Sequence, residues 1–115
     1  MKKYQLGEFE EVVMLTVGVL YGEAYGVSIK NDIETRLNRN VSVGALKSSL
    51  KRLENKGYLR SKEGESTAER AGRPKRYFYI TASGKRALEF VRNSRNNLWD
   101  AIPQVALDLK IAYSS

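Results

Sequence analysis

The chain has 115 residues and a formal net charge of +7, from 20 Lys and Arg residues against 13 Asp and Glu residues. It contains no cysteine and no histidine, which excludes disulfides, thiol nucleophiles, histidine acid–base catalysis and the usual zinc sites. The length predicts a single domain. No apolar run is long enough to span a membrane, and the N-terminal residues lack the apolar region of a secretory signal, so we expect a cytoplasmic protein. With so few catalytic residue types, we expect a binding protein that needs no cofactor and is not an enzyme.

Two amphipathic helices are predicted in the first 40 residues. In the first, over residues 6–20, apolar residues recur every three or four positions, so this helix should be largely buried. Its stripe comprises Leu6, Phe9, Val13, Val17 and Leu20, and it is widened by Val12, Leu15 and Val19. Gly22 and Gly26 separate it from a second helix, which ends at a polar turn over residues 38–40.

Acidic residues gather in these two helices. Paired carboxylates can serve acid–base catalysis, but nothing in the sequence places these in an apolar cleft beside a nucleophile. We interpret them as a solvated helix surface. They are Glu8, Glu10, Glu11, Glu23, Asp32 and Glu34.

The positive charge is concentrated in the middle of the chain. Residues 1–41 carry five basic and six acidic side chains, residues 42–76 carry ten and four, and residues 77–115 carry five and three. The middle segment therefore holds +6 of the net +7, as expected for a surface that binds nucleic acid. A solvated basic surface without such a partner is the alternative.

A third helix is predicted in this basic segment, from the N-cap Ser42 to about Lys56, with Gly57 as its C-terminal stop. Its leucines at 46, 50 and 53 should face the core, while the opposite face is basic and hydrogen-bonding and has no acid. Such a face suits the major groove of double-stranded DNA. The candidate DNA contacts here are Ser42, Gly44, Lys47, Ser48, Lys51, Arg52 and Asn55.

Two strands follow, predicted over residues 58–62 and 75–80 and joined by a polar loop from Glu63 to Pro74. Long loops are often functional, and the candidate DNA contacts in this wing are Arg70, Arg73, Lys75 and Arg76. The tripeptide Gly72-Arg73-Pro74 resembles the minor-groove core of an AT-hook, with a rigid turn as the alternative. In the return strand, Tyr77 and Tyr79 share one face and Phe78 and Ile80 the other, so one pair should be core and the other should pack on the wing.

Thr81 should cap a fourth helix, and Pro103 should either kink that helix or open a short final one. Its apolar stripe is longer than a small core needs, and an exposed stripe of this kind is rare on soluble monomers, so we expect a homodimer that binds an inverted-repeat operator. The candidate dimerisation residues are Leu88, Val91, Leu98, Trp99 and Ile102. The predicted fold class is mainly α with a small β wing: a winged helix-turn-helix domain over residues 1–81 and a C-terminal helical dimerisation segment over residues 82–115.

Several motifs together resemble the PadR family of bacterial transcriptional regulators over residues 6–92. They are Leu6-Gly7-Glu8-Phe9-Glu10, Tyr25-Gly26-Val27-Ser28-Ile29, Val41-Ser42-Val43-Gly44-Ala45-Leu46, the leucine-rich run that ends in Leu53-Glu54-Asn55-Lys56-Gly57, the wing segment 69–77 and Thr81-Ala82-Ser83-Gly84-Lys85. The resemblance implies a DNA-binding repressor of the small subgroup that has a single C-terminal dimerisation helix.

The resemblance also implies two points about individual residues. The family usually has Tyr after the residue corresponding to Leu46, where this chain has Lys47, so the choice of DNA site should differ from that of typical relatives. Some small relatives bind flat aromatic molecules at the dimer interface, which makes a small hydrophobic or aromatic effector near Trp99 the alternative to a packing role for that residue.

A different class of function is a winged-helix module that binds an acidic protein without binding DNA, because a fold does not fix a function. The basic outer face of the third predicted helix favours DNA, since protein interfaces usually centre on aromatic or aliphatic anchors.

Overall fold

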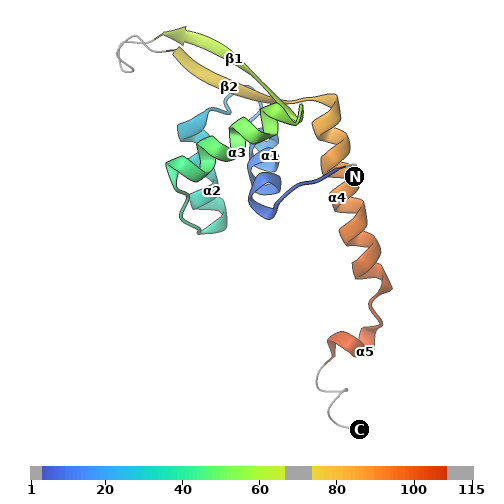
Figure 1. The fold of residues 1–115 in the computed structure, drawn as a ribbon. Coiled ribbons are helices and arrows are strands. Elements are labelled where there is room, and N and C mark those ends of the chain that lie inside the picture. The colour runs from blue at the N-terminus through green and yellow to red at the C-terminus, as the bar shows by residue number, and fades with distance from the viewer. Residues whose placement is uncertain (1–3, 67–73, 109–115) are drawn as a thin grey trace.

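A computed structural model describes residues 4–66 and 74–108 of the chain. The elements are α1 (Glu8–Val19), α2 (Gly26–Leu37), α3 (Val43–Asn55), β1 (Leu59–Ser66), β2 (Pro74–Ile80), α4 (Ala82–Ala101) and α5 (Gln104–Leu107). The first three helices pack together beside a two-stranded antiparallel sheet, and α4 leads away from them toward α5 (Figure 1). This arrangement confirms the predicted mainly α winged-helix fold with a small β wing. Within the described ranges, no helix combines the length and apolar character needed to cross a membrane.

Side-chain caps set the beginnings of α3 and α4. The Ala45 N–H donates to Ser42 Oγ at 3.0 Å, and the Gly84 N–H donates to Thr81 Oγ1 at 3.0 Å, which confirms both predicted N-caps. At the other end of α4, the helix stops at Ala101 and Pro103 is the N-cap of α5. Pro103 therefore opens a separate short helix, and Ile102, predicted to lie on the fourth helix, is instead its C-cap with extended backbone.

The core lies between the three-helix unit and the base of the sheet. Met14, Ile29 and Ile33 are buried at its centre. The three leucines of α3 at positions 46, 50 and 53 are buried against them, as predicted. Phe78 closes the core from β2, and its N–H donates to the Ala24 carbonyl oxygen at 2.8 Å. This bond ties the wing to the segment that precedes α2.

The wing is longer than predicted on its first strand. β1 pairs with β2 from Leu59 opposite Ile80 to Glu63 opposite Arg76, and after an irregularity Ser66 lies opposite Pro74. The strand therefore continues through the first residues of the predicted polar loop. Phe78 and Ile80 face the core, as one of the two alternating pairs was expected to do. Tyr77 and Tyr79 lie on the other face, where Tyr77 packs edge-on against Tyr25 and the Arg60 guanidinium lies over the Tyr79 ring.

Two expectations for α1 are wrong. Leu15 and Val19 are 50% and 57% exposed, so these two side chains lie outside the core that buries Val13, Met14 and Val17. Glu10, expected on a solvated surface, is buried with only 6% of its area exposed. Its carboxylate turns toward the C-terminal end of α3, where cationic groups compensate for the loss of water.

Candidate nucleic-acid interface

The outer face of α3 is open and basic. Gly44, Lys47, Ser48, Lys51 and Asn55 are all exposed, and the described residues offer no ion pair to either lysine. The helix is held from behind by its buried leucines, so this face is rigidly presented. Ser42 is exposed as well, but its hydroxyl is engaged as the N-cap. Five of the seven predicted α3 residues therefore form one continuous free surface.

Arg52 is placed differently from the other predicted α3 residues. Its Nε donates to Glu10 Oε2 at 3.4 Å and its Nη2 donates to Ser49 Oγ at 3.1 Å. The guanidinium is thus directed toward α1 rather than toward the open face. Because Arg carries five donors and its side chain is about half exposed, it retains hydrogen-bonding groups for an anionic partner.

Glu10 joins the first turn of α1 to the last turn of α3. It accepts hydrogen bonds from the Gly7 N–H at 2.8 Å and from Lys56 Nζ at 3.0 Å to both carboxylate oxygens. Burial alone would raise the pKa of Glu10, but the Gly7 N–H and the cations of Lys56 and Arg52 outweigh it, so the pKa lies below the ordinary value. The ionised carboxylate thereby fixes the orientation of α3 on α1.

We expect Glu10→Gln to lower the free energy of unfolding by about 1–2 kcal/mol at pH 7, because a buried charged acceptor is lost while its cations are partly exposed. A depressed folded-state pKa stabilises the protein above the unfolded value of about 4.3, and this contribution disappears as the pH falls through the folded pKa. The difference between variant and wild type should therefore shrink below about pH 4. Urea denaturation at a series of pH values measures it.

The matched control is Glu23→Gln, which changes an exposed acid and should alter stability by less than about 0.5 kcal/mol. A Glu10→Gln difference that is the same at every pH would contradict the ion-pair account.

The wing residues of the candidate interface are partly engaged within the protein. The Lys75 amine lies 4.3 Å from the centre of the Tyr25 ring, a cation–π contact. Arg76 donates to Ser61 Oγ at 2.7 Å and lies 3.5 Å from Glu63, while Ser61 donates to Glu54 at 2.6 Å. These contacts hold the strand bases beside α3. The predicted contacts Arg70 and Arg73, with the AT-hook-like tripeptide, lie outside the described residues.

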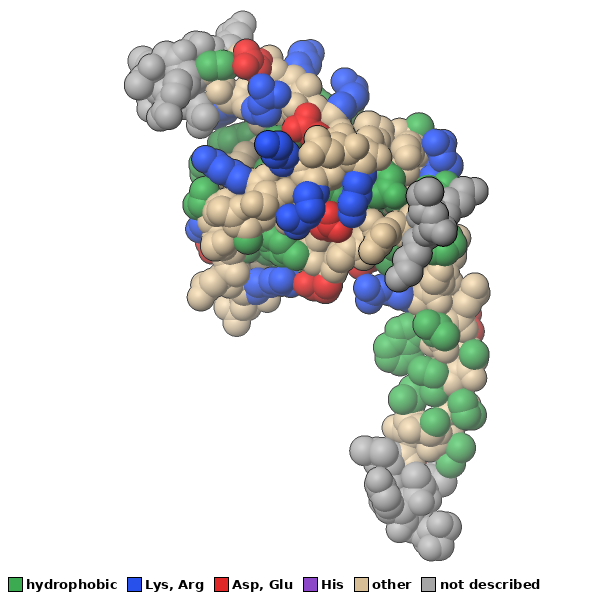
Figure 2. Space-filling model, viewed as in Figure 1, with side chains coloured by type: hydrophobic (Ala, Val, Ile, Leu, Met, Phe, Trp, Pro, Cys, Tyr) green, Lys and Arg blue, Asp and Glu red, His purple; other side chains and the backbone are tan. Residues whose placement is uncertain are grey.

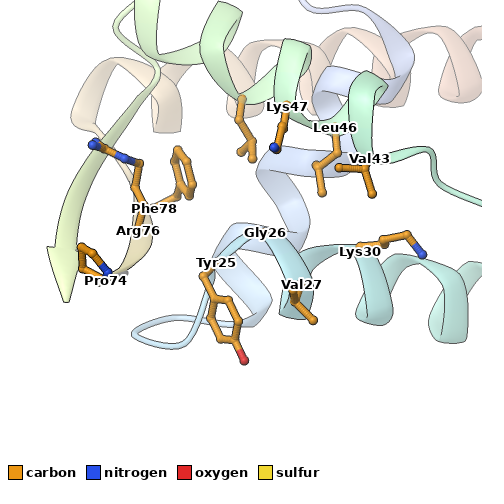
Figure 3. Close-up of a pocket in the computed structure, with 11 residues that line it drawn as sticks. Tyr25, Gly26, Val27, Lys30, Val43, Leu46, Lys47, Pro74, Arg76 and Phe78 are labelled. Carbon is orange, nitrogen blue, oxygen red and sulfur yellow. The ribbon is translucent and has the colours of Figure 1, made fainter. Parts of the chain in front are cut away.

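A groove opens between the starts of α2 and α3 and the strand β2. It has a volume of about 350 Å³, and Figure 3 shows side chains from all three elements around it. Its lining residues are Tyr25, Gly26, Val27, Lys30, Val43, Leu46, Lys47, Leu50, Pro74, Arg76 and Phe78. It is mostly apolar and contains no acid.

The candidate dimerisation residues divide into two groups. Leu88 packs against the core and Val91 is half-buried, whereas Leu98 and Trp99 are 70% and 64% exposed. Val105 and Leu107 of α5 extend this exposed apolar surface, which Figure 2 shows as green side chains along the lower part of the molecule. In the same view, Lys and Arg side chains are spread over the body that carries α3 and the wing.

A second groove, of about 490 Å³, lies between α1 and α4. Leu15, Leu88 and Trp99 contribute its apolar lining, and an ion pair of 3.0 Å between Glu11 and Arg95 crosses it. Over residues 4–66 and 74–108, no group of three or more acidic side chains is placed to hold a metal ion.

Comparison with known proteins identifies the family. Residues 15–90 match the transcriptional regulator PadR-like family, which is well over half of the chain. This protein belongs to the PadR-like family. Its members are transcriptional regulators and not enzymes, as the sequence predicted for this chain. Among curated proteins, none matches the chain significantly.

Solved structures of PadR-like regulators have the same fold. A PadR-like transcription factor from Bacteroides fragilis is 29% identical, with a TM-score of 0.67 over 80% of this chain and 84% of that one. A PadR family regulator from Eggerthella lenta is 23% identical, with a TM-score of 0.64 over 94% and 88%. PadR of Bacillus subtilis, solved in complex with operator DNA, is 17% identical, with a TM-score of 0.58 over 84% of this chain and 49% of that one.

Sequence reasoning missed several residues around the α2–α3–β2 groove of this PadR-like regulator. Tyr25, Val27 and Val43 line it, yet Tyr25 and Val27 were read only as part of the entry to the second helix. The sequence did contain one signal: Val27 and Val43 are apolar residues in the first turns of α2 and α3, where an exposed helix start would be polar. The proximity of these residues to β2 depends on tertiary structure, which no local sequence pattern predicts.

Proposed function

We propose that this PadR-like regulator binds specific sequences of double-stranded DNA as a homodimer and acts as a repressor at an inverted-repeat operator. The observation that carries the proposal is the outer face of α3, where Lys47 and Lys51 stand exposed beside Ser48 and Asn55 with no acid among them. A face of this kind combines phosphate attraction with groups that hydrogen-bond to base edges. Such activity belongs in the cytoplasm.

In this proposal, α3 enters the major groove and the wing contacts the adjacent backbone or minor groove. Lys51 and Asn55 are the proposed base-reading side chains, and Arg52, held by Glu10, contacts phosphate. The proposed DNA contacts of the wing are Arg70, Arg73, Lys75 and Arg76. The winged helix-turn-helix domain over residues 1–81 would thus be the DNA-binding part.

The proposed dimer is made by the segment over residues 82–115, chiefly through Leu98 and Trp99. Exposed apolar residues of α1, Leu15 and Val19, lend further surface. An apolar area of this extent on a monomer favours a two-fold partner. The proposed hydrophobic or aromatic effector would bind beside Trp99, in the groove between α1 and α4.

The affinity for duplex DNA should fall steeply with salt. If a dimer neutralises about 6–10 phosphates, a plot of the logarithm of the association constant against the logarithm of the salt concentration should have a slope of about −5 to −9. Fluorescence anisotropy with a labelled duplex at several salt concentrations measures it. A slope shallower than about −2 would contradict DNA binding through phosphate contacts.

In this proposal Lys47 contacts phosphate, so Lys47→Gln removes two phosphate contacts from a dimer and should make the slope shallower by about 2. Arg36→Gln is the matched control, because that guanidinium pairs with Asp32 at 3.1 Å on α2. The control should leave the slope unchanged.

A further inference from the structure

Two buried polar side chains hold one exposed guanidinium. Among the described residues, the buried polar or charged side chains are Glu10, Thr16 and Ser49. The Thr16 hydroxyl donates to the Val12 carbonyl oxygen at 2.8 Å, within its own helix. The other two both accept hydrogen bonds from Arg52, whose side chain is about half exposed. Because a buried acceptor is costly unless it is paired, both contacts favour one position of this guanidinium.

Glu10 does not need Arg52 in order to be ionised. Lys56 Nζ lies 3.0 Å from both of its carboxylate oxygens, and the Gly7 N–H donates to one of them at 2.8 Å. Arg52 contributes less than Lys56 to the low pKa of Glu10. Arg52, by contrast, has no other acidic partner among the described residues. The contact therefore determines where Arg52 lies rather than whether Glu10 is charged.

Arg52 borders the open face of α3 that is proposed to read bases. Residues three and four apart are neighbours on a helix surface, so Ser48 and Asn55 of that face lie beside it. An arginine side chain released from its acceptors would have this face within its reach. Its planar fork matches the O6 and N7 atoms of guanine, which is the commonest specific contact in the major groove. A free Arg52 would therefore add a base contact that the held one does not make.

We propose that Glu10 is a positioning residue for DNA recognition, which together with Ser49 confines Arg52 to a phosphate contact and keeps it from reading guanine. The inference rests on the proposed function, because it concerns how the same helix discriminates between sequences. Specificity depends on the contacts that a protein prevents as well as on those that it makes. Glu10 thus acts on the choice of sequence without touching DNA.

The restraint on Arg52 is measured first on the full-length protein without DNA, by NMR of the arginine side chains. The Nε–H proton of Arg52 should exchange with water about tenfold faster in Glu10→Gln than in the wild type, because its charged acceptor is lost. Lys56→Gln removes the other cation of Glu10 and should leave this exchange unchanged. A wild-type Arg52 proton that exchanges as fast as in Glu10→Gln would overturn the restraint.

Selection of binding sites from random duplex DNA measures the effect on recognition. Glu10→Gln should enrich guanine about tenfold at one additional position of each half-site. Ser49→Ala, which removes the second acceptor without a change of charge, should enrich guanine at the same position to a smaller extent. The double variant Glu10→Gln, Arg52→Gln should lose this new preference, because the side chain that would read guanine is gone.

Lys56→Gln is the matched control for the selection. It breaks the other ion pair between α1 and α3 but leaves Arg52 held, so it should select the wild-type sequence. A selected sequence that is unchanged in Glu10→Gln, or that changes equally in Lys56→Gln, would overturn the inference, since equal effects indicate a merely structural contact. A wild-type pool without any enriched sequence would overturn the proposed function and the guanine preference with it, whereas the exchange of the Arg52 proton would still decide whether Glu10 positions that side chain.

Discussion

Loss of the exposed apolar surface at the end of α4 is expected to convert the protein into a monomer. The double variant Leu98→Arg, Trp99→Arg places two charges on the most exposed apolar side chains of this helix, where a partner would have to desolvate them. Because a dimer engages two half-sites at once, affinity for specific DNA should fall by about 10²–10⁴-fold. Sedimentation of the variant and titration of duplex DNA measure both effects.

Truncation after Ser94 should also yield a monomer or an aggregating chain, which retains only weak, salt-sensitive binding to DNA. The control for the double variant is Asn93→Arg, because it adds a positive charge at an exposed position on another side of α4. A full-length protein that remains monomeric at tens of micromolar, yet binds its operator one-to-one, would contradict the dimer.

Gly84→Ala is expected to be the most destabilising single substitution of a small residue. A methyl group at position 84 would collide with the Tyr58 carbonyl oxygen and would lie 3.0 Å from Met14 Cε. The oxygen is not free to move, since it also accepts the Thr81 N–H at 3.1 Å. Either α4 or the start of β1 must shift, and we expect a loss of about 3 kcal/mol in the free energy of unfolding, measured by urea denaturation.

Gly44→Ala is the matched control. A methyl group at position 44 meets nothing within 4 Å, and the position is an exposed one in α3. The substitution should stabilise the protein by about 0.5–1 kcal/mol through helix propensity. A cost below about 1 kcal/mol for Gly84→Ala would show that the contact between α4 and β1 is easily rearranged.

The parts of the fold that were predictable are those set by local chemistry. Ser42 and Thr81 cap the two helices that they were predicted to cap. The leucines of α3 recur at a spacing that places them all on one face of the helix, and that face is the buried one. The alternation of Phe78 with its tyrosine neighbours likewise fixes which residues can share a face. In each case the determining groups are within a few residues of one another.

The features that escaped prediction depend on residues far apart in the chain. Glu10 is buried because its cations, Arg52 and Lys56, lie 42 and 46 residues away. β1 runs past its predicted end because Glu63 lies opposite Arg76, 13 residues further along the chain, and the pairing continues beyond it. The groove exists because α2, α3 and β2 meet, and two of the cations that line it, Lys30 and Arg76, pair with Glu34 and Glu63.

The most direct test of DNA recognition by α3 is selection of binding sites from a random pool of duplex DNA by the full-length protein. The expected product is an inverted repeat whose half-sites are separated by about one helical turn or a multiple of it. Repeated with Lys51→Ala, the selection should yield altered base preferences within each half-site, whereas Arg36→Ala should reproduce the wild-type sequence. A pool in which no sequence is enriched by the wild type would contradict sequence-specific binding by this protein.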